Sequence, residues 1–173
     1  MLLYHGSDTE IQQPDISFNT GFADLGAGFY LTDNYEAAVG RARSRARKTG
    51  AARGVVSTFK FDEAQLPWIT WDSKVAPTAP DQPFDLRSGT TDAGIAAWAN
   101  YIKACRSGHT TVGNAEPAVV RAWIATEDIE MVCAGFAPDE ELASFIDPQD
   151  LIVQYCFRSQ QAIDELLVFV RAE

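Results

Sequence analysis

Cysteine, histidine and basic residues are scarce in this chain. Its 173 residues include three cysteines, two histidines and 14 lysines and arginines against 24 aspartates and glutamates, for a net charge of −10. The cysteines are far apart and form no CxxC pair, which argues against a disulfide framework and a structural zinc site. Two histidines cannot build a His-rich metal site. We therefore expect reduced thiols that pack as small hydrophobic groups, and no metal.

Long hydrophobic runs and a basic, apolar N-terminal leader are also missing. No apolar run approaches the roughly 20 residues that a membrane helix needs. The first residues lack the features of a signal peptide. The 46% hydrophobic and 11% aromatic content excludes a disordered chain, and the length fits one domain over residues 1–173. We expect a protein without membrane contact, resident in the cytoplasm or delivered into the cytoplasm of a target cell.

The few basic residues are unevenly distributed. Nearly half of them fall in one short stretch: Arg41, Arg43, Arg45, Arg47, Lys48 and Arg53. The interval between Arg121 and Arg158 contains no Lys or Arg and is rich in Asp and Glu. An acidic chain is a poor general binder of nucleic acid, because phosphate contacts need Lys and Arg. The basic stretch fits either a solvated helix face or a site for an anionic ligand, and the acidic interval is a candidate partner face.

Hydrophobic periodicity predicts short strands and helices in mixed order. The expected strands cover residues 2–5, 29–31, 55–61, 129–133, 151–157 and 167–170. The expected helices cover residues 35–48 and about 95–105, with two more beginning near Pro138 and Ser159. Thr32, Asp33 and Asn34 are all suitable caps for the helix from residue 35. The order lacks βαβ regularity, so the sequence predicts an α+β domain.

The familiar hydrolase and nucleotide motifs are absent, and three short pieces remain. There is no GxSxG, P-loop or HExxH, and the glycines of residues 26–28 precede a strand rather than a helix, unlike a dinucleotide fingerprint. The remaining pieces are Tyr4–Ser7 at the end of the first strand, Gly26–Thr32, and Gln154 in a late strand. Taken singly, each has an ordinary structural reading as core, turn or solvated strand. Their conjunction in this order is what points to a site.

Together the pieces resemble the ADP-ribosyltransferase superfamily, in its His-Tyr-Glu (diphtheria-toxin and PARP-like) branch. More narrowly, the chain is similar to a bacterial domain-of-unknown-function family, DUF3990, whose members read like LYHGS, then DFGKGFYLT-xx-YEQA, then a late Q-x-x-F strand. The likeness is dense over Leu3–Ser7 and Asp24–Ala37, looser from Ile129 onward, and poor over residues 62–92. It implies a split β-sandwich of two small, mostly antiparallel sheets with flanking helices.

The resemblance also implies roles for individual residues around NAD. His5 would bond the adenine-side ribose, the Gly6 backbone would hold the nicotinamide carboxamide, and Ser7 would touch the other ribose or the amide. Tyr30 would stack on the nicotinamide ring. Gln154 takes the place of the superfamily's catalytic Glu, so His5, Tyr30 and Gln154 form the implied catalytic set.

One aromatic residue of PARP-like relatives has no counterpart. These relatives carry a second Tyr about three helical turns after the first, and here that position is Arg41. Tyr35, earlier on the same predicted helix, is the candidate replacement as an NAD contact.

The implied function is an NAD-dependent mono-ADP-ribosyltransferase, toxin- or effector-like. It would break the nicotinamide–ribose bond through an oxocarbenium-like state and pass ADP-ribose to a macromolecule, a protein or a nucleic acid. NAD is then a substrate, and a neutralising protein partner fits such an enzyme. A Gln lacks the carboxylate charge, which costs about 1–2 kcal/mol or roughly tenfold in rate, and it cannot act as a base. We therefore expect an acceptor that needs little deprotonation. An NAD glycohydrolase and a catalytically silent binding module of the same fold remain the alternatives.

Overall fold

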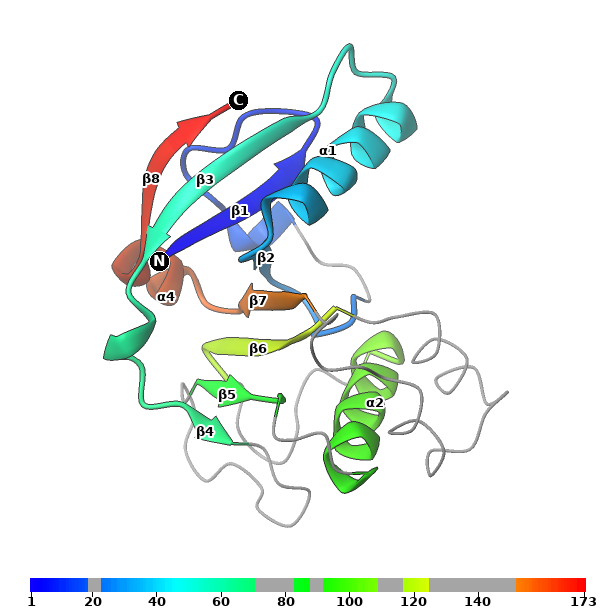
Figure 1. Cartoon of the computed structure of the whole chain (residues 1–173), viewed down its shortest axis with the longest axis vertical. Coiled ribbons are helices and arrows are strands. Elements are labelled where there is room, and N and C mark those ends of the chain that lie inside the picture. The colour runs from blue at the N-terminus through cyan, green and yellow to red at the C-terminus, as the bar shows by residue number, and fades with distance from the viewer. Residues whose placement is uncertain (19–22, 71–82, 88–91, 109–116, 125–151) are drawn as a thin grey trace.

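The computed structural model describes residues 1–18, 23–70, 83–87, 92–108, 117–124 and 152–173 (Figure 1). Its strands are β1 (Leu2–Ser7), β2 (Phe29–Thr32), β3 (Val55–Phe61), β4 (Ile69–Thr70), β5 (Phe84–Asp85), β6 (Val119–Trp123), β7 (Val153–Phe157) and β8 (Leu167–Ala172). Its helices are α1 (Tyr35–Thr49), α2 (Asp92–Arg106) and α4 (Gln160–Leu166), with 3-10 turns at Ile16–Phe18 and Glu63–Gln65. The predicted α+β class is confirmed.

All eight strands are linked into one sheet, in the order β4-β5-β6-β7-β2-β1-β3-β8. The β4–β5 and β5–β6 pairs are parallel and the others are antiparallel. The link between β1 and β2 is a single residue pair, Tyr4 with Thr32, whereas β1 pairs with β3 along its whole length from Leu2 to Ser7. The two sheets that the resemblance implies are therefore two halves, which this one residue pair connects.

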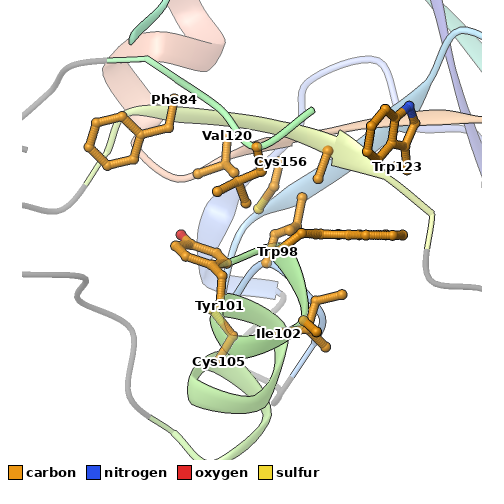
Figure 2. Packing of buried hydrophobic residues seen from close by; sticks show 12 residues of the cluster. Phe84, Trp98, Tyr101, Ile102, Cys105, Val120, Trp123 and Cys156 are labelled. Atoms are coloured by element: carbon orange, nitrogen blue, oxygen red, sulfur yellow. The ribbon is translucent and has the colours of Figure 1, made fainter. Parts of the chain in front are cut away.

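Three groups of buried side chains hold the layers together. α1 packs on β1 and β3 through Ala38, Ala42 and Val56. α2 packs on the other half of the sheet, and Figure 2 shows side chains of this helix turned toward those of β6 and β7. The third group lies between the halves and includes strand residues from both together with α4. The molecule is thus layered as a helix, a half-sheet, a shared core, a second half-sheet and a second helix.

Helix α1 begins and ends at residues suited to those places. The side chain of Asn34 accepts a hydrogen bond from the Ala37 N–H at 2.9 Å, so Asn34 is the cap among the three candidates. Gly50 ends the helix with φ of 75°, in the left-handed region where glycine has no steric penalty. The predicted helix 35–48 is one residue shorter than the observed one.

Some of the other predicted elements are confirmed, some observed strands were not predicted, and some predictions concern residues outside the described ranges. The strand over Val55–Phe61 is confirmed, and β1 runs two residues beyond its predicted end. The sequence analysis missed β4, β5 and β6. The strand expected at 129–133, the helix expected near Pro138 and Cys133 lie outside the described residues. Cys105 and Cys156 are buried and unbridged, which confirms their packing as small hydrophobic groups.

Burial raises the pKa of both described thiols, of Cys105 to about 11 and of Cys156 to about 12, so both stay protonated at neutral pH. No helix in the described part of the chain is long and apolar enough to span a membrane.

Candidate functional site at the divergence of β1 and β2

The backbone of Gly6 faces the place where β1 and β2 part. Val56, opposite Gly6 in β3, exchanges both of its backbone hydrogen bonds with Glu173, at 2.8 and 3.0 Å. Since residues of an antiparallel pair alternate between bonded and non-bonded positions, Gly6 turns its own N–H and C=O away from β3 and toward β2. Tyr4 does the same and pairs with Thr32, but two residues later β2 forms no pair with Gly6. Gly6 therefore presents one backbone donor and one acceptor at the divergence.

His5 spans the divergence with its side chain. Its Nδ1 lies 2.7 Å from the Tyr30 carbonyl oxygen, and its ring stacks on Phe29 with centroids 4.5 Å apart. A carbonyl oxygen can only accept, so Nδ1 carries the hydrogen and Nε2 of the neutral ring is an acceptor. Burial lowers the pKa of His5, and the positive charges of Arg41 and Arg45 lower it further, against the bond to Tyr30. The imidazole is accordingly neutral at pH 7, with its acceptor nitrogen pointing away from Tyr30.

Helix α1 crosses directly over Gly6. A Cβ at Gly6 would lie 2.0 Å from the Ala38 carbonyl oxygen and 2.7 Å from the Ala42 nitrogen, both backbone atoms. No side chain fits there, so close packing of the helix is sufficient to require glycine. The same approach brings Arg41 and Arg45, one turn apart on α1, close enough for their charges to act on His5.

Ser7 is the last residue of β1, and Asp8 follows it on the same side of the divergence. Ser7 is buried and its hydroxyl donates to Asp8 Oδ1 at 3.1 Å, while Arg45 Nε lies 3.8 Å from the same oxygen. A side-chain hydrogen bond from Thr49 is the largest cause that lowers the pKa of Asp8, with smaller contributions from Ser7 and Arg45. The Ser7 hydroxyl hydrogen is thereby engaged, and its oxygen is left as an acceptor.

The Tyr30 hydroxyl holds the glycine-containing turn in front of β2. It donates to the Gly26 carbonyl oxygen at 2.6 Å and accepts from the Leu25 N–H at 2.9 Å, and Gly26 has φ of 83°. Burial raises the pKa of Tyr30 far above its usual value, so the hydroxyl stays protonated. The ring is only partly buried, against the core group under α2. Its hydroxyl is therefore structural, and the remaining exposed ring surface is what it offers a ligand.

Gln154 is buried on β7, an inner strand of its half-sheet. It lies opposite Thr32 of β2 and Ala122 of β6, and its Nε2 donates to the Trp123 carbonyl oxygen at 3.1 Å. That carbonyl fixes the amide orientation, because only the NH₂ end can donate to it. Directly opposed residues share a sheet face, so Gln154 lies on the same face as Thr32 and, diagonally, Tyr30. The amide oxygen is the end left for another partner.

Tyr35 lies apart from the other predicted residues. Its ring packs edge-on against Tyr4, with centroids 5.4 Å apart, and it lines a hollow together with Val56 and Glu173. Burial, with the nearby Glu173 carboxylate, raises the pKa of Tyr35. The structure thus gathers His5, Gly6, Ser7 and Tyr30 at the divergence and places Gln154 further along β2, but it does not bring Tyr35 there.

Sequence reasoning missed two parts of this arrangement. The charges of both Arg41 and Arg45 act on the pKa of His5, and the four-residue spacing of the two on a predicted helix is the signal that could have shown that they act together. The hydrogen-bond partner of the Gln154 amide is the backbone carbonyl of Trp123, and a pattern of side chains in the sequence cannot predict a backbone partner. In the part of the chain that the structure describes, no three His, Cys, Asp or Glu side chains gather as a metal site would require.

Comparison with known proteins places the chain in one family. The sequence model of a family described as "Protein of unknown function (DUF3990)" matches residues 1–169. No curated protein and no solved structure matches the chain significantly.

Proposed function

This chain belongs to the DUF3990 family of proteins of unknown function, and we propose that it is an NAD-dependent mono-ADP-ribosyltransferase. The observation that carries the proposal is the Gly6 backbone, whose N–H and C=O face the divergence at a position where β2 forms no residue pair with Gly6. A primary carboxamide such as that of nicotinamide has one acceptor and two donors, and it complements this pair.

The neighbouring groups suit the rest of the dinucleotide. The Nε2 of neutral His5 can accept a hydrogen bond from a ribose hydroxyl, and the Ser7 oxygen can accept another. The exposed part of the Tyr30 ring offers an aromatic face to the nicotinamide, which is cationic until it leaves. The charges of Arg41 and Arg45, which act on His5, favour the diphosphate by the same proximity. Arg41 stands at the position of the second aromatic residue of PARP-like relatives, and its guanidinium would not stack on a cationic ring. We therefore propose an aromatic contact on one face of the nicotinamide only, from Tyr30.

The proposed reaction breaks the bond between the nicotinamide nitrogen and the ribose carbon. The bonding electron pair leaves with nicotinamide, the ribose carbon becomes oxocarbenium-like, and an acceptor lone pair then bonds to it while the acceptor's proton passes to solvent. The amide oxygen of Gln154 would accept from a ribose hydroxyl and hold the sugar. Gln cannot take a proton, so the acceptor must be nucleophilic without an enzymic base. A toxin- or effector-like setting with a neutralising partner remains part of the proposal.

Two alternative functions would use the same site. With water as acceptor the protein would be an NAD glycohydrolase. A silent binding module is favoured by one observation: the Gln154 amide is already bonded to the Trp123 carbonyl, as a core residue would be.

The test incubates the protein with NAD labelled in the ADP-ribose part and a cell lysate, then separates protein, nucleic acid and free ADP-ribose. His5→Asn is the decisive variant, because an asparagine amide can still donate to the Tyr30 carbonyl but lacks the Nε2 acceptor. Lys60→Gln, an exposed change on β3, is the control. Label in a macromolecule that is lost with His5→Asn and kept with Lys60→Gln supports the transferase. Free ADP-ribose alone supports the glycohydrolase, and intact NAD supports the silent module.

A further inference from the structure

Helix α1 carries arginines on two opposite sides. Residues four apart share a helix face, whereas residues two apart lie on opposite sides. Arg41 and Arg45 act on His5 of β1, and Arg45 also lies 3.8 Å from Asp8, which follows β1. Arg43 and Arg47 line a groove on the β3 side. The second pair is not used by the site at the divergence.

The groove runs along α1 in two connected parts. The larger part, about 680 Å³, lies at the end of the helix and is lined by Arg43, Arg47 and Arg53. The smaller, about 350 Å³, shares Arg43 and Arg53 with it and extends to Tyr35 and Glu173. Except for the arginines, the larger part is lined by glycine and alanine alone. Small side chains leave the groove shallow and open to an extended ligand, and three guanidiniums border it.

These arginines are exposed, and their charge is not balanced locally. Among the described residues, none of Arg43, Arg47 and Arg53 forms an ion pair within 4.0 Å. Glu173, the one acidic residue among the described residues that line the groove, is itself paired with Arg171 at 3.2 Å. Arg47 lies in the last turn of α1, where a cation interacts favourably with the helix dipole. The helix dipole does not explain the presence of Arg43, which is not in the last turn, or of Arg53, which follows the helix.

We propose that this groove binds the sugar-phosphate backbone of a nucleic acid. Guanidinium groups bind phosphate in a bidentate way, and three of them along an open groove fit a chain of phosphates better than a single small anion. The groove presents no exposed large apolar side chain for insertion into a lipid surface. Of the lining residues that the structure describes, Tyr35 alone has an aromatic ring, so we expect backbone contacts with little dependence on base sequence. Binding here does not require NAD chemistry, but in a transferase it would hold the acceptor.

The test measures binding of the whole protein to a fluorescent DNA duplex, and to one of its strands, by anisotropy over a salt series without NAD. Three phosphate contacts predict a slope of about −2.7 for log affinity against log salt with the duplex and about −2.1 with the single strand. Affinity should therefore fall about 20- to 40-fold between roughly 50 and 200 mM salt. The variant Arg43→Gln/Arg53→Gln should reduce the slope by about 1.4 to 1.8 and lose most of the binding.

A matched double change removes the same charge elsewhere. Lys60→Gln/Lys103→Gln alters β3 and α2 outside the groove and should leave binding within about twofold of the unaltered protein. Absence of binding at low salt would overturn the proposal, as would binding that survives Arg43→Gln/Arg53→Gln or falls equally in both double variants. Vesicles containing phosphatidylserine are the third probe, and binding to vesicles but not to DNA would also overturn it. Because NAD is absent throughout, loss of the transferase proposal would leave this result intact.

Discussion

Strands β1 and β7 carry the residues at the two ends of the proposed site, and they differ in how fully neighbouring strands pair with them. β1 is paired with β3 on one side, and on the other it pairs with β2 at Tyr4 alone, so the Gly6 N–H and C=O face a place where β2 forms no residue pair with Gly6. The charges of Arg41 and Arg45 act on the neighbouring His5. β7 is bonded on both sides, to β2 and β6, and Gln154 is buried there with its NH₂ on a backbone carbonyl. The β1 side turns backbone polar groups toward the divergence, whereas the β7 side holds Gln154 as a buried neutral side chain that is bonded through its NH₂ group.

The largest expected effect is on the β1 side, at Gly6→Ala. The new Cβ meets backbone atoms of α1 that cannot rotate away, so α1 must shift, at a cost of about 3 kcal/mol or more. Gly40→Ala is the matched control, because no atom lies within 4 Å of a Cβ there and alanine favours a helix by about 0.5–1 kcal/mol. Denaturant unfolding of both variants checks this, and a Gly6→Ala protein as stable as the parent would contradict the packing of α1 on β1.

The next effect is on the β7 side, at Gln154→Glu. A carboxylate would face the Trp123 carbonyl with no hydrogen to donate, so we expect a loss of about 1–3 kcal/mol at neutral pH. The folded-state pKa of the new carboxyl should rise above the usual value of about 4.3, since its protonated form can donate. The loss should then be present at pH above that value and disappear as the pH falls below it.

Unfolding curves of Gln154→Glu and Gln154→Met at neutral and acidic pH provide the check. The methionine variant loses the same hydrogen bond but has no charge to titrate. Equal pH dependence in the two would argue against the contact with Trp123.

A smaller effect is expected from Tyr30→Phe. It removes both hydrogen bonds that hold the turn at Leu25 and Gly26, which should cost about 1–2 kcal/mol while the ring stays in place. Tyr4→Phe is the control, since the contact of Tyr4 with Tyr35 is through the ring. Thermal unfolding should separate the two variants, and equal midpoints would mean that the Tyr30 hydroxyl does not hold the turn.

The smallest expected effect is on the titration of His5. Its pKa is lowered in the folded protein, so its contribution to stability is present above the usual value near 6.5 and decreases as the pH falls through and below it. In Arg41→Gln/Arg45→Gln the pKa should move part of the way back up, because two nearby positive charges are gone. Imidazole proton shifts in NMR measure this, with the His5 signal assigned by its absence in His5→Asn. An unchanged pKa would place the arginines away from His5.

The comparison of β1 with β7 also shows what sequence reasoning could reach. Local signals were sufficient to predict α1 to within one residue and the alternating strand Val55–Phe61, although they left the cap of α1 open among Thr32, Asp33 and Asn34. Strands β4 and β5 have two residues each and depend on their neighbours, and β6 follows Pro117 without a period-two pattern. These are tertiary pairings that local sequence does not encode.

The same distinction applies within the site. The resemblance identified His5, Gly6, Tyr30 and Gln154 as residue types in order. It could not show that β2 forms no residue pair with Gly6, that the Tyr30 hydroxyl is already hydrogen-bonded, or that Gln154 bonds to Trp123. Each of these depends on the register of strands distant in sequence. Tyr35 was chosen for its place on α1, but its side chain packs against Tyr4 instead.

The most direct test of the account is the backbone amide signal of Gly6 in ¹⁵N-labelled protein during titration with NAD. The account predicts a saturable shift of the Gly6 signal, together with its neighbours in β1, and loss of that shift in His5→Asn. A Gly6 signal that stays in place up to millimolar NAD, or that stays in place while other signals show NAD bound elsewhere, would contradict it.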